Sequence, residues 1–227
     1  MTYPKITLQA ARVNVFMNQE EAAKELSISK ATLQNYESGA TVPNWDMVKQ
    51  MEKLYNIPAT GLRFFTVYGP AGRPDMAYFG FTNKLLKGET IQIFNYGNCK
   101  RDFTYVDDIV EGVIRIMQGA PEKKVGEDGL PLPPYAVYNI GNNSPENLLD
   151  FVNILQEELV RAGVLGADYD FEAHKELVPM QPGDVPVTYA DTTALERDFG
   201  FKPSTSLRSG LRQFAQWYKA FYIEKDI

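Results

Sequence analysis

The pattern of the sequence changes at Pro58, and this change limits the chain to a two-part architecture. Before Pro58, four short amphipathic segments follow one another, and none shows the two-residue alternation of a strand. After Pro58, β-branched and aromatic strand patterns alternate with helical patterns. The sequence therefore predicts an all-α module over residues 1–58, followed by an α/β region over residues 59–227.

Residues that start and stop helices define the helices of the first region, which are expected over residues 6–17, 19–26, 30–38 and 44–55. Asn18 with Glu21 makes a capping-box pattern, Ser29 and Asn44 cap the next two helices, and Gly39 ends the third. The apolar stripes of the first and last helices are predicted to contain Ile6, Ala10, Val13 and Met17, and Trp45, Val48, Met51, Leu54 and Tyr55.

The second region is predicted to contain strands at 61–68, 91–94, 136–140 and 187–190. Its expected helices cover 77–87, 106–118, 144–162, 192–198 and 207–222. Pro, Gly and charged residues predict a surface loop over 119–134. Asp107 and Asp108 are interpreted as helix caps without a ligand role.

Composition narrows the class of protein. Hydrophobic residues make up 44% of the 227 residues and charged residues 23%, which is typical of a soluble globular protein. No apolar run approaches the roughly 18 residues of a membrane span, and residues 1–20 lack a secretory-signal pattern, so we expect no membrane partner. Cys99 is the single cysteine, which excludes an intrachain disulfide and favours a cytoplasmic location. With one histidine, His174, no metal site of soft ligands is expected.

The net charge of −6 is unevenly distributed along the chain. Residues 1–58 contain six Lys or Arg and six Asp or Glu, so the rest of the chain carries the whole negative charge. An acidic surface repels nucleic acid. Any DNA binding must therefore come from a local patch on the first region.

Residues 19–39 resemble the phage-repressor-like (XRE-type) helix-turn-helix family. The matching features are Gln19 at the start of a helix, the small Ala23, Ile28 in the turn, and Glu-Ser-Gly at 37–39. The resemblance covers about residues 5–58 and implies DNA as a partner.

The resemblance implies that the helix over 30–38 presents its first side chains to base edges in the major groove. Lys can donate to guanine, Asn or Gln can pair with adenine, and the methyl groups of Ala and Thr can contact thymine. By the same resemblance, Gln19 is expected at a phosphate. The alternative is that this polar helix face is only solvated. The candidate DNA-binding residues are Gln19, Lys30, Ala31, Thr32, Gln34 and Asn35.

Residues 57–222 resemble the UDP-glucuronate 4-epimerases of the extended short-chain dehydrogenase family. The landmarks follow one another in the family's order: residues 60–70, 72–76, 100–108, 137–141, 180–184, 189–191 and 200–201. The resemblance implies a partial Rossmann fold that corresponds to the C-terminal, substrate-binding half of these enzymes. It also implies a UDP-sugar as a candidate partner.

The resemblance implies roles for four side chains. Thr66 and Arg73 are expected at the sugar carboxylate, Arg101 near the diphosphate and Asp184 near the uridine ribose. Arg suits both anions because its planar fork donates two parallel hydrogen bonds. The chain has Gln181 where many members of the family have Arg, which predicts a weaker phosphate contact.

The sequence lacks the two motifs that carry catalysis in this family. No G-x-x-G-x-x-G follows a strand pattern, although the family seats NAD on such a loop. The spacing Tyr-x-x-x-Lys occurs at Tyr96 and Lys100, but in a predicted turn rather than a helix, and is interpreted as chance. We therefore expect no catalytic residues and no NAD bound by this chain alone, although NAD is the cofactor of the parent family.

Three functional readings remain open. The chain is a recombined DNA-binding protein with a nucleotide-sugar-binding remnant, or an epimerase fragment that needs its missing half, or an engineered chimera without an evolved function. The strands at 61–68 and 136–140 would belong to a parallel sheet whose central strands are absent. Unpaired strand edges promote association, so we also expect self-association through the exposed sheet edge.

Overall fold

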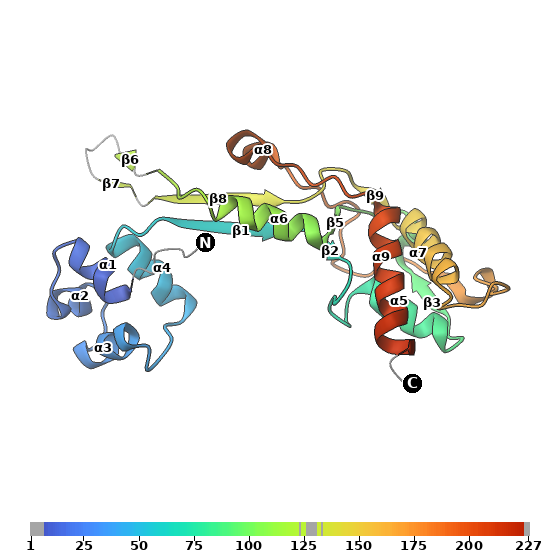
Figure 1. The fold of residues 1–227 in the computed structure, drawn as a ribbon, viewed down its shortest axis with the longest axis horizontal. Helices are drawn as coiled ribbons and strands as arrows, with labels where there is room; N and C mark the ends of the chain where they lie inside the picture. Colours follow the sequence, from blue (N-terminus) through green and yellow to red (C-terminus); the bar gives the residue numbers. More distant parts are fainter. Residues whose placement is uncertain (1–6, 123, 126–130, 133, 225–227) are drawn as a thin grey trace. The chain divides into compact units, whose positions relative to one another are not determined.

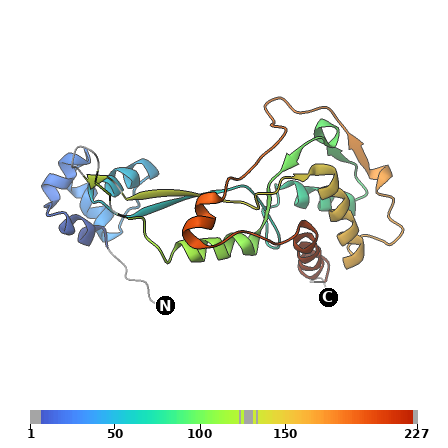
Figure 2. The ribbon, with the colours of Figure 1, turned by 90° about the horizontal axis from the view of Figure 1, so that it is seen from above.

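The computed structural model describes residues 7–122, 124–125, 131–132 and 134–224 (Figure 1, Figure 2). The chain divides into two compact units. The helical unit contains residues 1–61 and 119–137, and the α/β unit contains residues 62–118 and 138–227. The domain boundary at residue 58 stays a prediction.

In the described part of the helical unit, the helices are α1 (Leu8–Asn14), α2 (Gln19–Glu25), α3 (Lys30–Ser38) and α4 (Trp45–Leu54). Each begins at a side chain that accepts a backbone N–H of the first turn, a donor that has no partner inside the helix. These caps are Thr7, Asn18, Ser29 and Asn44. Asn18 and Glu21 form the predicted capping box, and α3 ends at Gly39 with a left-handed φ of 76°. The predicted helix order and its caps are confirmed.

The helical unit has an apolar core of its own, formed by Ala11, Ala22, Ala23, Leu26, Leu33, Met51 and Tyr55. The stripe predicted for the first helix is partly wrong, because α1 buries Ala11 and Arg12 and leaves Val13 53% exposed, whereas Met17 packs against this core as expected. Ile6, from the same predicted stripe, lies outside the described residues. Met51 of α4 and Tyr55, which caps its C-terminal end, are buried as expected, but Trp45 is 65% exposed.

Residues 119–134 were expected to form only a surface loop, and this prediction is wrong at two short strands. β6 (Lys124–Val125) pairs antiparallel with β7 (Pro131–Leu132). Two-residue strands are too short to produce an alternating pattern in the sequence. The rest of this prediction concerns in part residues 123, 126–130 and 133, which lie outside the described residues.

The strands of the α/β unit pair two by two within the described residues. The parallel pairs are β2 (Thr66–Tyr68) with β5 (Phe103–Tyr105), and β3 (Ile91–Ile93) with β10 (Lys175–Leu177). β4 (Lys100–Arg101) pairs antiparallel with β9 (Glu146–Asn147). β1 (Ala59–Phe64) pairs with β8 (Tyr135–Ile140).

Two strand predictions need correction. The strand expected over 61–68 is divided at Phe65 into β1 and β2, which pair with different partners. The strand expected over 187–190 is an isolated bridge between Val187 and Lys100. Both differences depend on partners that are distant in the sequence, so the local pattern could not reveal them.

The helices of the α/β unit are α5 (Ala77–Leu86), α6 (Val106–Ile116), α7 (Leu148–Ala162), α8 (Thr193–Phe199) and α9 (Leu207–Tyr218), with the short turns η1 (Phe94–Gly97), η2 (Glu172–His174) and η3 (Lys219–Ile223). The helix predicted from residue 144 starts at Leu148, because β9 occupies 146–147 and the Asn147 side chain caps α7.

The interpretation of Asp107 and Asp108 as helix caps is also wrong. Both lie in the first turn of α6, and Tyr105 occupies the cap position without a side-chain hydrogen bond. The carboxylate of Asp108 instead accepts the backbone N–H and the hydroxyl of Thr205, both at 3.0 Å. Asp108 therefore holds the segment before α9 against α6.

An aromatic cluster packs α7 and α9 against β2 and β5. The rings of Phe103 and Phe151 stack with centroids 4.1 Å apart, and Tyr68 lies edge-on to both. Gly210 lets α9 approach closely, because a Cβ at this position would lie 2.4 Å from the Tyr68 hydroxyl oxygen. On α6, Ile109 and Ile116 belong to a second apolar cluster, which also contains residues of β8 and α8.

Candidate functional site

The exposed face of α3 carries most of the residues that are predicted to contact DNA. The exposed ones are Lys30, Ala31, Gln34 and Asn35. Thr32 is half-buried, and its hydroxyl lies 2.8 Å from the Ser29 hydroxyl. Because Ser29 also accepts the N–H of Thr32 at 3.0 Å, Thr32 belongs to the cap of α3.

Gln19 belongs to a hydrogen-bond network that joins α1, α2 and α3. Its Nε2 donates to Glu37 at 2.8 Å, and its Oε1 accepts from Gln34 Nε2 at 3.1 Å. Glu37 also binds Arg12, with Nε at 2.6 Å and Nη2 at 3.3 Å. The side chains of this ion pair are 7% and 5% exposed. The sequence pattern did not indicate the pair, because its members are 25 positions apart.

The charges at the start of α2 are locally balanced. Asn18 Oδ1 accepts the N–H groups of Glu20 and Glu21, both at 2.9 Å. The Glu20 carboxylate pairs with Lys30 at 2.7 Å, and this hydrogen bond and the charge of Lys30 lower the pKa of Glu20. A DNA phosphate that approaches Lys30 must therefore compete with Glu20. Phosphate contact by Gln19 stays a prediction.

In the α/β unit, the structure brings together two of the residues that were predicted to bind a nucleotide sugar. Arg101 Nη2 donates to Asp184 Oδ1 at 2.7 Å. Arg101 lies on β4, and the segment after Asp184 runs along this strand, because Lys100 N donates to the Pro186 carbonyl and Thr188 N to the Lys100 carbonyl. A ligand anion that binds Arg101 must therefore displace or share this carboxylate.

Arg73 lines a separate cavity of about 400 Å³, formed mainly by residues 64–73 together with Met76, Tyr78 and Val106. The exposed guanidinium of Arg73 is paired with Asp75, whose hydrogen bond raises the pKa of Arg73. Thr66 is not among the residues that line this cavity, and its N–H donates to the Asp102 carbonyl at 3.1 Å. Of the four predicted residues, Arg73 is the one that lines this cavity.

Asp102 is a positioning residue that the sequence pattern did not reveal. Its side chain is fully buried and accepts three backbone N–H groups, from Asn142 at 2.8 Å, Asn143 at 3.1 Å and Ala190 at 2.9 Å. These donors lie 40, 41 and 88 positions away, so no local signal exists. Asp102 fixes the backbone beside Arg101 to two other segments.

The formal Tyr-x-x-x-Lys match has no helical geometry. Tyr96 lies in η1 with a left-handed φ of 52°, whereas Lys100 lies on β4. In the family's chemistry the Lys must lie beside the Tyr hydroxyl to lower its pKa. The interpretation of this spacing as chance is therefore consistent with the backbone of this segment.

The part of the chain that the structure describes contains neither a membrane-spanning helix nor a cluster of metal ligands. No helix in this part is long and apolar enough to cross a membrane. The same residues contain no group of three His, Cys, Asp or Glu side chains that could hold a metal ion. Cys99 is a free, buried thiol.

Two family models match the chain. Residues 8–62 match a helix-turn-helix model. Residues 43–141 match the model of the NAD dependent epimerase/dehydratase family. Residues 43–62, which include α4, are therefore matched by both models.

Curated relatives are similar to most of the chain. The chain is 46% identical over 182 residues to the "Uncharacterized 37.6 kDa protein in cld 5'region" of Escherichia coli O111:H-, and 47% identical over 182 residues to Protein CapI of Staphylococcus aureus. Both matches cover 78% of this chain and 52% of the relative. UDP-glucuronate 4-epimerase 4 of Arabidopsis thaliana is 45% identical over 175 residues, 74% of this chain and 38% of that protein. The chain thus spans about half the length, or less, of these curated relatives.

Solved structures give the same result. UDP-glucuronic acid 4-epimerase of Bacillus cereus, in complex with UDP-glucuronic acid and NAD, matches with a TM-score of 0.59 and 28% identity over 78% of this chain and 50% of that chain. UDP-glucose 4-epimerase of Thermotoga maritima, with UDP-glucose, matches with a TM-score of 0.58 and 27% identity over 76% and 50%. The chain therefore matches a helix-turn-helix model over residues 8–62 and the NAD dependent epimerase/dehydratase model over residues 43–141, and most of it is similar to about half, or less, of UDP-glucuronate 4-epimerases.

Proposed function

We propose that this chain binds double-stranded DNA through α3. The observation that carries the proposal is the exposure of Lys30, Gln34 and Asn35 on one short helix. That helix is held against α2 by the bonds of Gln19 to Gln34 and Glu37. A recognition helix needs this combination of exposed side chains and fixed orientation, because base edges are read at hydrogen-bond distance.

On a duplex selected from a random pool, Asn35→Ala is expected to weaken binding about tenfold, since a bidentate amide-to-adenine contact contributes about 1–3 kcal/mol of discrimination. Fluorescence anisotropy of the labelled duplex measures this. Gln50→Ala is the matched control, because it removes an exposed amide from α4, and it should leave the affinity unchanged. Equal losses in both variants, or no loss in Asn35→Ala, would contradict the proposal.

Nucleotide-sugar binding is a second candidate function, favoured by the contact between Arg101 and Asp184. The Bacillus cereus relative was solved with UDP-glucuronic acid, and we propose a ligand of this class for the α/β unit. Arg101 would bind the diphosphate and Asp184 the ribose, while Thr66 and Arg73 would bind the sugar carboxylate. Binding requires Arg73 to turn from Asp75 toward the ligand, since the guanidinium is now paired with that side chain.

We also propose that these 227 residues do not epimerise the ligand by themselves. They contain no G-x-x-G-x-x-G after a strand, and their Tyr-x-x-x-Lys spacing lies outside a helix. Bound NAD would supply hydride transfer, and no residues of this chain form the loop that seats its diphosphate in the family. If the chain is an enzyme fragment, a partner that supplies the other half of the enzyme would restore turnover. If the chain only binds the nucleotide sugar, such a partner would not.

Titration calorimetry of the full chain with UDP-glucuronate is expected to show binding without NAD, and added NAD should not change the affinity. Arg101→Ala should weaken this binding at least about tenfold, because hydrogen bonds to a charged partner contribute about 1.5–3 kcal/mol. Arg63→Ala, which removes an exposed arginine from β1, is the control and should have no effect. Binding that requires NAD, or no binding by a folded protein, contradicts this second proposal.

A further inference from the structure

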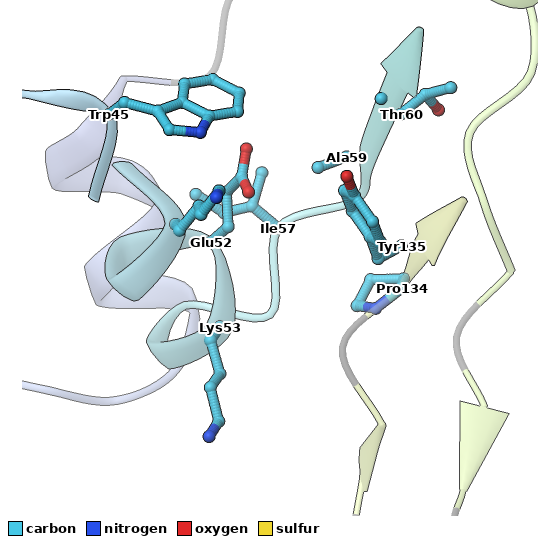
Figure 3. A pocket seen from close by; sticks show the side chains of 10 residues that line it. Trp45, Glu52, Lys53, Ile57, Ala59, Thr60, Pro134 and Tyr135 are labelled. Atoms are coloured by element: carbon cyan, nitrogen blue, oxygen red, sulfur yellow. The ribbon is translucent and has the colours of Figure 1, made fainter. Parts of the chain in front are cut away.

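The helical unit contains a cavity that belongs to neither of the sites described above. It has a volume of about 490 Å³ and is lined by residues of α4, the start of β1 and the start of β8, all within the helical unit (Figure 3). Small-molecule pockets typically measure about 300–1,000 Å³. The cavity is therefore large enough for a ligand of roughly drug size.

Two exposed aromatic side chains form opposite walls of this cavity. Figure 3 shows Trp45 on the side of α4 and Tyr135 on the side of the strands, with Ile57 and Ala59 between them. Trp45 is 65% exposed and Tyr135 is 56% exposed. Gly61 leaves room for the Tyr135 ring, because a Cβ at this position would lie 2.6 Å from the Tyr135 hydroxyl oxygen. Neither ring belongs to an apolar cluster of the described residues, so both are available to contact a ligand.

A carboxylate without a partner faces the space between the two rings. Figure 3 shows the Glu52 carboxylate directed toward Trp45, whereas Lys53 points away from the cavity. Among the described residues, the Glu52 side chain has no hydrogen bond or ion pair. Lys49 also lines the cavity, and its Nζ lies 5.3 Å from the centroid of the Trp45 ring. The Trp45 ring is thus already positioned to receive a cation.

We propose that this cavity binds a lipophilic organic cation. The apolar body of the ligand lies between Trp45 and Tyr135, and its positive nitrogen lies near the Glu52 carboxylate. Aromatic faces attract cations through their quadrupole, and a carboxylate forms charge-assisted hydrogen bonds with a cationic nitrogen. An anion of the same size would meet the Glu52 carboxylate, which is directed toward Trp45. Lys49 is the competing cation within the chain, and a ligand displaces it from Trp45.

The test is calorimetric titration of the full chain with rhodamine 6G, a planar lipophilic cation, and with 8-anilinonaphthalene-1-sulfonate, a planar anion. We expect saturable binding of the cation and at least about tenfold weaker binding of the anion. Glu52→Gln and Trp45→Ala should each weaken binding of the cation about tenfold. Lys49→Met should strengthen it, because the competing charge is removed.

Glu25→Gln is the matched control, because it makes the same change of charge on an exposed position of α2. It should leave the affinity unchanged, and circular dichroism establishes that each variant is folded. The proposal is overturned by the absence of saturable binding to the folded chain, by equal affinity in Glu52→Gln and Glu25→Gln, or by tighter binding of the anion. DNA is absent from this experiment, so its outcome does not depend on the function proposed for α3.

Discussion

Glu37→Gln is expected to destabilise the helical unit by about 3–5 kcal/mol, because it leaves the guanidinium of Arg12 buried without its counter-charge. Arg12 and Glu37 join α1 to α3, and both side chains are almost fully shielded from water. Replacement of the carboxylate also weakens the anchor for Gln19. Hydrogen exchange of the full chain, followed by mass spectrometry, measures the loss as faster exchange in α1, α2 and α3.

Two controls separate the buried charge from a general effect of mutation. Glu25→Gln changes an exposed carboxylate and should alter stability by less than about 0.5 kcal/mol. The double variant Arg12→Met with Glu37→Met removes both charges and should recover most of the loss, since apolar replacement of a buried pair is often neutral. A single variant that is as stable as the unsubstituted chain would contradict this account of the network.

The ion pair between Arg12 and Glu37 should also make the stability of the helical unit depend on pH in the acid range. Burial alone raises the pKa of Glu37, but the hydrogen bonds from Arg12 and Gln19 and the charge of Arg12 outweigh it, so the net pKa is lowered. A lowered acidic pKa contributes stability above the unfolded-state value of about 4.3. This contribution is lost as the pH falls through the folded-state pKa. The exchange protection of α1 to α3 should therefore decrease below about pH 4.3 and be unaffected near neutrality.

Asp102→Ala is expected to destabilise the α/β unit by about 4 kcal/mol, because it leaves three N–H donors, one of them buried and two half-buried, without an acceptor. The donors belong to Asn142, Asn143 and Ala190, which lie on two separate segments. Loss of the carboxylate should also release the backbone next to Arg101. Urea unfolding of the full chain measures the destabilisation, and hydrogen exchange should assign it to residues near 142 and 190.

Asp102→Asn is the conservative variant, because its amide oxygen can still accept part of the hydrogen bonding. It should lose about half as much stability as Asp102→Ala. Asp168→Ala, at an exposed position, is the control and should change stability by less than about 0.5 kcal/mol. Similar stability of Asp102→Ala and Asp168→Ala would contradict the positioning role of Asp102.

The parts of the fold that depend on local chemistry could be predicted from the sequence. Asn18 and Glu21 are three positions apart, and the side chain of each accepts a hydrogen bond from the backbone N–H of the other. The start of α2 therefore follows from residues that are close together in the chain. Ser29 and Gly39 define α3 in the same way. The exposure of Lys30 and Asn35 follows from their positions on that helix.

The contacts that depend on distant partners could not be predicted from the pattern. In the sequence, Arg12 interrupts an apolar stripe and gives no sign that it is buried. Its burial depends on the ion pair with Glu37, which only the tertiary structure shows. The two-residue strands β4 and β9 pair with each other across 45 to 47 positions, which no local pattern can reveal. Asp102 looks like an ordinary charged residue after β4, and only the tertiary structure shows that it is buried.

The junction between the two parts lies in a segment that fits both families. Met51 of α4 and its C-cap residue Tyr55 belong to the core of the helical unit, and the same residues fall inside the match to the epimerase/dehydratase model. Recombination of two proteins is one of the readings of the sequence, and the overlap of the two family models over residues 43–62 is consistent with it.

Selection of duplexes from a random DNA pool with the full chain tests the central claim most directly. The account predicts enrichment of a defined sequence motif, and loss of that enrichment when Asn35 is replaced by Ala. It also predicts that the enriched duplex slows hydrogen exchange in α3. Recovery of only random sequence by a protein that circular dichroism shows to be folded would contradict the claim that α3 reads DNA.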